Sequence, residues 1–298
     1  MPLRLAIVGP GRVGQAFGRR FHESGVDLLG YVGRTRASAE HACAFAGAGQ
    51  PLEFRDLPRA HVVVFAVGDP QLPAAVEAAV AAVAQRPCSL WIHTSARYSL
   101  EALLPLAGKG VRIGVLHPVM PFASAASAVA EMAGKPATLI SDPRARHLLL
   151  VLCRRLSLVP VWAHPGGERA LYHAACVLAA NGLTALRRAV DEVFFASNSL
   201  SSTDAAAVAD ALMRAALDSC ARRGPVAALS GPVVRGDADT LRVHRRALSV
   251  SAPELDRLYC ELMRAALPMA RERGLLDADA IAVQRALAEP KALAEGAP

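Results

Sequence analysis

The chain has 298 residues, of which 53% are hydrophobic and 20% are charged. This length and composition suit a folded protein of two domains and exclude a disordered chain. No apolar run is long enough to cross a membrane, and the first apolar run is typical of a strand and not of a signal peptide. We therefore expect a cytoplasmic protein that makes no contact with a membrane.

The formal net charge of +7 raises the question of a nucleic-acid partner. Against this, the arginines are dispersed along the chain, and aromatic residues make up only 5% of it, which leaves few platforms for base stacking. Attraction of an anionic cofactor and a small anionic substrate explains the positive balance better. We expect no nucleic acid among the partners.

The cysteines are scattered and form no C-x-x-C pair, so the sequence predicts reduced thiols, with neither a disulfide framework nor a metal site. The six are Cys43, Cys88, Cys153, Cys176, Cys220 and Cys260.

The stretch LAIVGPGRVGQAFGRRF begins with an apolar run at residues 5–8 that is typical of a buried parallel strand. Gly9, Gly11 and Gly14 follow at G-x-G-x-x-G spacing, and the chain continues in a helical pattern. In this context the glycines permit a tight turn and a close approach of backbone to a pyrophosphate at a helix N-terminus. We expect cofactor contacts along the whole turn: Gly9, Pro10, Gly11, Arg12, Val13 and Gly14.

Strand-like and helical stretches alternate through the first half, which predicts a doubly wound parallel sheet in an NADP-binding Rossmann domain over residues 1–160. The expected strands are 3–8, 27–32, 61–67, 88–94, 111–118 and 137–142, with 158–164 as a further candidate.

The end of the second expected strand distinguishes NADP from NAD. An NAD site places an acidic residue about 20 positions after the glycines, where it accepts from the ribose 2′-hydroxyl. Here Arg34, Thr35 and Arg36 occupy that place. Guanidinium groups suit a 2′-phosphate, so we expect NADP(H). An exposed basic turn that binds nothing would have the same sequence pattern.

Ligands of doubly wound sheets lie outside the carboxyl ends of the strands. Gly68 and Thr94 follow two of the expected strands, and we expect them beside the nicotinamide ribose. His117 ends another strand, where it either points into the cleft or caps the strand.

The second half is helical in pattern, which predicts a helical substrate and dimerisation domain over residues 161–298. Its expected helices are 167–196, 203–223, 238–249, 254–273 and 278–288. On the first of them, His173 and Asn181 are eight residues apart and share one broad face. Asn181 lies in apolar surroundings, so we expect its amide to bond either a neighbouring loop or a polar substrate.

This segment resembles the ketopantoate reductase helix, whose pattern is K-x-x-x-N-x-x-x-N-P-L-T-A-L. Asn181 to Leu186 match its end, so the resemblance puts His173 at the catalytic lysine and Val177 at the first asparagine. The whole chain resembles more closely the Rossmann-like proteins with a DUF2520 domain, through YHAA, an asparagine eight residues after that histidine, and SGPVVRGD followed by a histidine. These proteins are related to ketopantoate reductase and pyrroline-5-carboxylate reductase, in the 6-phosphogluconate dehydrogenase-like superfamily. The resemblance implies catalytic roles for His173 and Asn181, and a homodimer.

The loop at 229–244 carries three expected substrate-binding residues. Arg235 could clamp a substrate carboxylate, Ser230 could bond a carbonyl or hydroxyl, and Asp237 could bind substrate or cap the following helix. We expect the cleft between the domains to be the active site, with Arg235 facing it.

Together these features predict an NADPH-dependent oxidoreductase that reduces a small carbonyl acid, similar to ketopantoate reductase, with His173 as the proton donor. A pyrroline-5-carboxylate-type imine reductase and a non-catalytic NADP-binding regulatory protein are the alternatives.

Overall fold

The computed structural model describes residues 3–82 and 89–288, so the predicted thiol of Cys88 lies outside the described residues. Contacts within the chain divide it into two compact units, Met1–Ala180 and Asn181–Pro298. This division falls later than residue 160, because the last strand of the sheet and the helix after it belong to the first unit. Within the described residues, no helix has the length and apolarity that a bilayer crossing requires.

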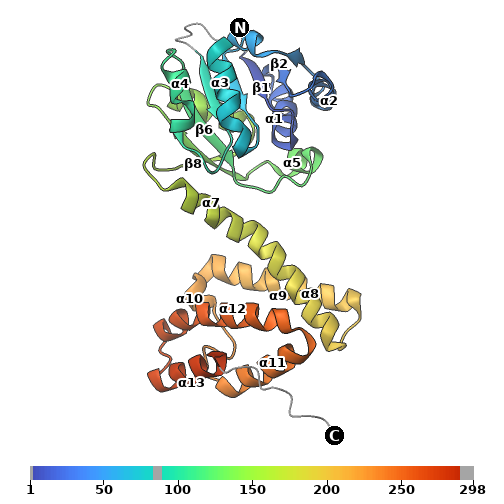
Figure 1. The fold of residues 1–298 in the computed structure, drawn as a ribbon, viewed down its shortest axis with the longest axis vertical. Coiled ribbons are helices and arrows are strands. Elements are labelled where there is room, and N and C mark those ends of the chain that lie inside the picture. The colour runs from blue at the N-terminus through green and yellow to red at the C-terminus, as the bar shows by residue number, and fades with distance from the viewer. Residues whose placement is uncertain (1–2, 83–88, 289–298) are drawn as a thin grey trace. The chain divides into compact units, whose positions relative to one another are not determined.

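The first unit is built on an eight-stranded sheet of order β3-β2-β1-β4-β5-β6-β7-β8 (Figure 1). Its first six positions have the strand order of dinucleotide-binding sheets. The strands are β1 (Arg4–Val8), β2 (Asp27–Val32), β3 (Gln50–Leu52), β4 (Val62–Phe65), β5 (Leu90–His93), β6 (Arg112–Pro118), β7 (Pro136–Ser141) and β8 (Val159–Trp162).

The expected doubly wound fold is confirmed, with the last two strands, β7 and β8, running opposite to the first six. β7 pairs with β6 antiparallel, and β8 pairs with β7 in parallel. The N–H of Val119, just after β6, donates to the carbonyl of Pro136 at the start of β7 (2.8 Å). The chain therefore enters β7 at the same end of the sheet at which it left β6, and no crossover to the other end of the strands is needed.

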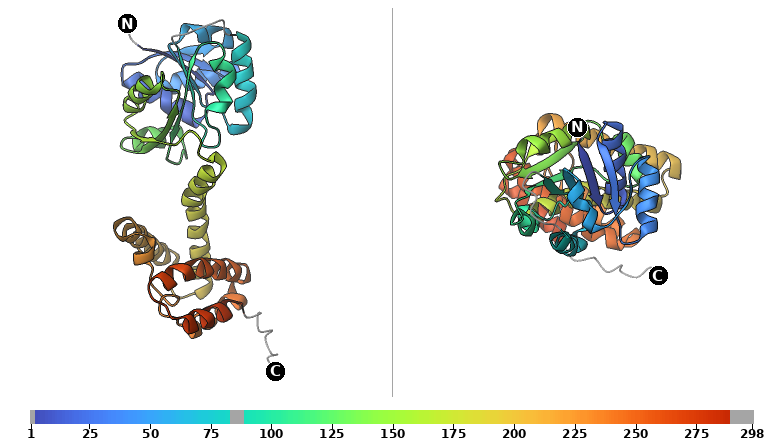
Figure 2. Two further views of the ribbon diagram at one scale, coloured as in Figure 1. Left: turned by 90° about the vertical axis from the view of Figure 1, so that its left-hand side faces the viewer. Right: turned by 90° about the horizontal axis from the view of Figure 1, so that it is seen from above.

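Helices cover both faces of this sheet (Figure 2). They are α1 (Arg12–Glu23), α2 (Arg36–Ala46), α3 (Leu72–Ala82), α4 (Leu104–Ala107), α5 (Ala125–Glu131) and α6 (Arg146–Arg155), with the 3₁₀ turns η1 (Phe54–Arg59), η2 (Asp69–Gln71) and η3 (Leu100–Leu103). A further helix, α7 (Arg169–Val177), follows β8 at the end of the sheet (Figure 1).

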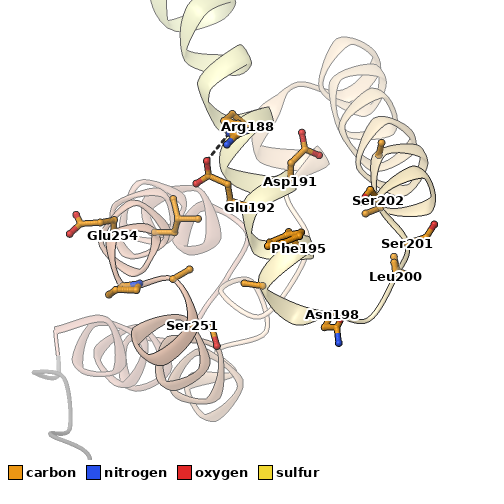
Figure 3. A pocket seen from close by; sticks show the side chains of 16 residues that line it. Arg188, Asp191, Glu192, Phe195, Asn198, Leu200, Ser201, Ser202, Ser251 and Glu254 are labelled. Atoms are coloured by element: carbon orange, nitrogen blue, oxygen red, sulfur yellow. Dashed lines mark hydrogen bonds and ion pairs between the residues drawn. The ribbon is translucent and has the colours of Figure 1, made fainter.

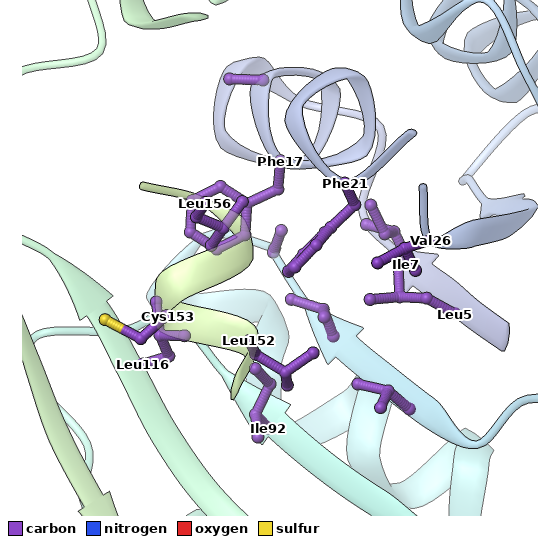
Figure 4. Close-up of a cluster of buried hydrophobic side chains, with 14 of the residues drawn as sticks. Leu5, Ile7, Phe17, Phe21, Val26, Ile92, Leu116, Leu152, Cys153 and Leu156 are labelled. Carbon is purple, nitrogen blue, oxygen red and sulfur yellow. The ribbon is translucent and has the colours of Figure 1, made fainter. Parts of the chain in front are cut away.

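Alternate residues of the strands supply two separate cores. Leu5 and Ile7 of β1 face Phe17 and Phe21 of α1 in a cluster that also takes in α6 (Figure 4). Ala6 and Val8 belong to the other cluster, which contains α3. This alternation of faces follows from the two-residue period of a strand, and it fixes the register of the sheet.

The second unit is helical throughout its described residues, as expected. The π-helix η4 (Leu178–Gly182) follows α7 and spans the division between the units. The helices after it are α8 (Leu183–Ser197), α9 (Ser202–Arg223), α10 (Pro225–Ala228), α11 (Ala238–Ser251), α12 (Pro253–Glu272) and α13 (Asp277–Ala288). Leu241, Leu267 and Val283 lie in a core formed mainly by α11, α12 and α13.

Candidate functional site

The glycine-rich turn after β1 has the backbone geometry that a phosphate cradle requires. Gly9 has a φ of +107°, and a Cβ there would lie 2.5 Å from the carbonyl oxygen of Ala66. A Cβ at Gly14 would collide with the carbonyl oxygen of Gly9, so glycine is needed where helix and turn pack closely. A Cβ at Gly11, in contrast, would meet no atom within 4 Å. The side of the turn at Gly11 is therefore open.

The N-terminus of α1 is prepared for an anion. Gly11 is its N-cap, and no side chain caps the helix or places an acid in its first turn. The first backbone N–H groups of the helix and the positive end of its dipole are thus available to a negatively charged group. Two features hold the turn in place: Gln15 donates to the carbonyl of Pro10 (2.8 Å), and Val13 packs against the core.

The turn lies at the point where the strand order reverses, between β1 and β4. Sheets of this kind bind their ligands in the crevice outside the strand ends at that point. Arg12 donates to the carbonyl of Phe122 (3.3 Å), which brings the segment after β6 to the turn as well. The residues at this edge therefore fit the pyrophosphate of a dinucleotide.

The basic turn after β2 is partly occupied by local contacts. Thr35 caps α2 by accepting from the N–H of Ser38 (3.2 Å), and Arg36 forms an ion pair with Glu40 (2.9 Å). The three residues predicted to hold the 2′-phosphate, Arg34, Thr35 and Arg36, are all exposed. An exposed ion pair is weak, so Arg36 is able to turn toward a phosphate at small cost.

Gly68 and Thr94 both lie just past strand ends at the carboxyl edge. Gly68 is the N-cap of η2, and Thr94 donates its N–H to the carbonyl of Phe65 (3.1 Å). Half-buried Asp69 follows Gly68, at the same edge.

Two histidines at this edge are held in the neutral form by their surroundings. His93, at the end of β5, is fully buried; its Nε2 lies 2.9 Å from the carbonyl of Ser99, and its Nδ1 accepts from the N–H of Ser95 (3.2 Å). Burial lowers the pKa of His93. For His117 in β6, burial, followed by the charge of Arg169, lowers the pKa to about 4.

His117 takes part in a polar cluster that joins the sheet to α7. Its Nδ1 lies 2.9 Å from the hydroxyl of Tyr172, and the Thr138 hydroxyl lies 3.0 Å from the same oxygen. Burial raises the pKa of Tyr172, so its phenol stays protonated. This cluster ties β6 to α7. The two interpretations of His117, that it points into the cleft or that it caps the strand, stay predictions.

Arg169, the first residue of α7, is a residue that the sequence reasoning missed. Its side chain is buried, and its guanidinium carbon lies 4.1 Å from the centre of the Tyr172 ring. A cation in the first turn opposes the helix dipole, and this was the signal in the sequence that could have drawn attention to it.

The predicted catalytic pair differs in burial. His173 is half-buried on α7, and its charge is one of those that act on His117. Asn181 is exposed, and so is Val177. The expectation that the Asn181 amide bonds a neighbouring loop or a polar substrate stays a prediction.

The three predicted substrate residues of the second unit lie in the turn before α11. Asp237 is the N-cap of α11: it accepts from the N–H and the hydroxyl of Thr240 (3.0 and 2.7 Å), and these bonds lower its pKa. Ser230 and Arg235 are exposed, and a guanidinium nitrogen of Arg235 lies 3.9 Å from Asp237. The cap explains Asp237 locally, while substrate binding by Ser230 and Arg235 stays a prediction.

A hollow of about 1170 Å³ in the second unit is lined by α8, the start of α9 and the turn between α11 and α12 (Figure 3). Asp191, Glu192 and Glu254 lie on its walls beside the ring of Phe195, and Arg188 is paired with Glu192 (2.7 Å). Each of these three acids is paired with an arginine: Arg187, Arg188 or Arg257. None of the sequence-predicted site residues lines it.

The described residues contain no group of side chains able to hold a metal ion. Their five cysteines are free thiols, as expected.

Two family models match this chain. A Rossmann-like domain matches residues 1–118, and a domain of unknown function, DUF2520, matches residues 136–266. The expected resemblance is thus confirmed. The second match begins at β7, so it includes the end of the sheet, His173 and the turn before α11. A comparison with curated proteins finds no match.

Solved structures share the fold at low sequence identity. Protein BF3122 of Bacteroides fragilis, assigned as an NADP oxidoreductase, is 18% identical over 90% of this chain and 98% of its own, with a TM-score of 0.71. An imine reductase of Streptomyces aurantiacus is 17% identical over 96% and 100% of the chains, with a TM-score of 0.63. A pyrroline-5-carboxylate reductase of Coxiella burnetii is 16% identical over 90% and 97%, with a TM-score of 0.59. These likenesses establish the fold.

Proposed function

For a chain that joins a Rossmann-like domain to a DUF2520 domain, we propose the activity of an NADPH-dependent oxidoreductase that reduces a small carbonyl acid. The observation that carries this proposal is the glycine-rich turn. Its open side at Gly11 and the uncapped N-terminus of α1 lie at the switch point of the sheet. Structural neighbours that are named as an NADP oxidoreductase and as reductases support it.

In this proposal the residues from Gly9 to Gly14 hold the pyrophosphate, and Gly68 and Thr94 border the nicotinamide ribose. Arg34, Thr35 and Arg36 hold the 2′-phosphate. The cofactor supplies a hydride to the carbonyl carbon. His173 donates the proton that the carbonyl oxygen then needs, since histidine is the side chain that most often serves as a general acid. Tyr172 is less suited to this role, because His117 and Thr138 already engage its hydroxyl.

The second candidate is reduction of an imine acid. The neighbours named as pyrroline-5-carboxylate reductase and imine reductase favour it. A cationic imine needs less acid catalysis than a carbonyl, so a weak dependence of turnover on His173 would favour this candidate. The exposed apolar side chains of α8 and α9 support a homodimer as the working form.

The test is a fluorescence titration with NADPH and NADH, followed by steady-state oxidation of NADPH with 2-oxo acids and with cyclic imine acids. We expect NADPH to bind more tightly than NADH. We expect Gly11→Ala to weaken the binding of NADPH by roughly tenfold or more, because the added methyl group enters the space that the phosphate needs. His173→Gln should lower kcat by roughly 10²–10⁴-fold on a 2-oxo acid, with NADPH binding kept.

The matched control is Gly108→Ala. Its Cβ would meet only ordinary contacts, the nearest at 3.5 Å, and Gly108 lies in the turn after α4. This variant should bind NADPH as the unmodified chain does. If neither dinucleotide binds, or if both glycine variants bind equally well, the chain is not a dinucleotide-dependent reductase.

A further inference from the structure

Arg169 is a buried cation that forms no ion pair among the described residues, although the charge of Glu101 acts on it. Its exposed fraction is 7%, and its Nε and Nη2 are both buried without a hydrogen-bond partner. One face of its guanidinium lies over the ring of Tyr172. Buried polar atoms of native proteins nearly always have partners, so two orphaned donors on one side chain call for an explanation.

The groups around Arg169 do not supply an anion. His93 and His117 are uncharged, and Arg169 itself acts on both. The nearest acid named among its electrostatic neighbours is Glu101, whose Oε1 accepts from the N–H of Ser99 (2.7 Å). The carboxylate of Glu168 caps the N-terminus of α7 by accepting from the N–H of Ala170 (2.9 Å), and it does not bond Nε or Nη2 of Arg169. The surroundings of Arg169 therefore favour an anion from outside the chain.

The two orphaned atoms also define the shape of that anion. Nε and Nη2 present parallel N–H groups along one edge of the planar guanidinium. This is the fork that a carboxylate meets with both of its oxygens. Two contacts tie the start of α7, and with it this fork, to the carboxyl ends of the strands. Tyr172, one turn further along α7, bonds His117 at the carboxyl end of β6, and the Ser99 hydroxyl bonds the carbonyl of Pro165 just before α7 (3.5 Å).

We propose that Arg169 is the subsite for the carboxylate of the substrate. The role as a substrate subsite rests on the proposed reductase function, whereas anion binding at Arg169 stands without it. Both nitrogens are shielded from water, so the carboxylate displaces neighbouring protein atoms as it binds. Arg235, the residue that the sequence favoured for this role, is a poorer candidate, since its side chain is 63% exposed and lies beside Asp237.

The experiment measures thermal unfolding of the full chain at constant ionic strength. The probes are pyruvate and 3-methyl-2-oxobutanoate, with their amides as uncharged controls. We expect the two carboxylates, and not the amides, to raise the Tm of the unmodified chain. Arg169→Met should weaken the binding of both carboxylates by roughly tenfold or more. It should not lower the Tm of the ligand-free chain, because it removes an unbalanced buried charge.

Two further variants sharpen this test. Arg169→Lys keeps the charge without the fork, so it should lose most of the carboxylate effect even if Arg169→Met fails to fold. Arg146→Met is the matched control, since Arg146 also lies over an aromatic ring, that of Trp162 (3.7 Å), but is exposed. It should respond to carboxylates as the unmodified chain does.

Three results would overturn the proposal: carboxylates that leave the Tm of the unmodified chain unchanged, an unaltered response in the two Arg169 variants, or loss of the response in Arg235→Met alone. Weaker NADPH binding in Arg169→Met with carboxylate binding kept would also overturn it, because a cofactor phosphate would then be the occupant. If carboxylates bind through Arg169 but neither dinucleotide binds, the reductase function fails and the anion subsite stands.

Discussion

His117 shows how far the setting of one residue determines its chemistry. The ring lies between the hydroxyls of Tyr172 and Thr138, and the charged or titratable groups that act on it are Arg169, His173, Asp69 and His93. Burial is the largest influence, and the charge of Arg169 is the next. Both disfavour the imidazolium form. Protonation of His117 therefore opposes folding.

This leads to a prediction for the pH dependence of stability. The pKa of His117 is about 4 in the folded chain, against 6.5 for the free side chain, so the unfolded chain binds the extra proton between these values. The contribution of neutral His117 to the free energy of unfolding is therefore complete above pH 6.5. The free energy of unfolding falls by about 3 kcal/mol as the pH drops toward 4. Urea titrations across this range measure it, and the buried His93 adds to the fall in the same direction.

The matched pair for this measurement is His117→Gln and His22→Gln. His22 is exposed on α1, so its replacement should leave the slope unchanged. His117→Gln should flatten the slope between pH 4 and 6.5. Equal slopes in both variants would contradict the assignment to His117.

Residues of the site differ in how well the sequence could predict them. Gly14, which packs on the carbonyl of Gly9, and the Asp237 cap depend on neighbours within a few positions, so a local pattern can predict them. The close approach of Gly9 to Ala66, in contrast, depends on the packing of two strands. The bond between His117 and Tyr172 joins residues 55 positions apart, and the burial of Arg169 depends on the same packing. No local pattern contains such contacts.

At the scale of elements, hydrophobic periodicity predicted most strands and helices. It missed β3, because three residues with a central proline carry no readable alternation. It also could not give the direction of β7, since an alternating or apolar run looks the same in parallel and antiparallel pairing. Strand direction here depends on where the chain re-enters the sheet.

The helices of the second unit are joined by a buried ion pair that leads to a second prediction. Arg245 of α11 meets both oxygens of Asp256 of α12 (3.1 and 3.2 Å) and donates to the carbonyl of Ala286 of α13 (2.8 Å). Asp256→Ala removes the carboxylate that two nitrogens of this largely buried guanidinium meet, and it should lower the free energy of unfolding by about 3 kcal/mol. Chemical denaturation followed by circular dichroism measures this loss.

Glu254→Ala is the control for that variant. Glu254 lies on the same helix and pairs with Arg257 at 3.6 Å, but both side chains are exposed. Its loss should change the free energy of unfolding by less than about 1 kcal/mol. Similar effects of the two variants would show that the buried pair does not join the three helices.

At the scale of the whole molecule, α8 and α9 carry apolar side chains that the other described residues leave exposed. α8, which is described along its full length, has no buried residue, and α9 has only Ala205 and Ala209. Phe195 is 83% exposed, and Leu212 and Leu217 are also exposed. Water-facing apolar surface of this kind marks an interaction site.

We expect a second copy of this chain to cover that surface. A two-fold interface brings the same patch of both subunits together, so each apolar patch is buried against its copy and no other protein is required. A stable dimer buries roughly 800 Å² on each subunit, which the paired helices α8 and α9 are long enough to provide. Light scattering after size-exclusion chromatography should give twice the chain mass of 31.2 kDa.

Phe195→Asp should convert this dimer to a folded monomer, because a carboxylate at the centre of an apolar interface loses its hydration without gaining a partner. Leu104→Asp is the control: Leu104 is an exposed leucine of the first unit, and its replacement should leave the dimer intact. A monomeric unmodified chain, or a dimer that survives Phe195→Asp, would mean that a different molecule covers α8 and α9. Since α8 follows directly on the helix that carries Arg169 and His173, the monomeric variant also measures whether that helix needs the second copy to hold NADPH and carboxylates.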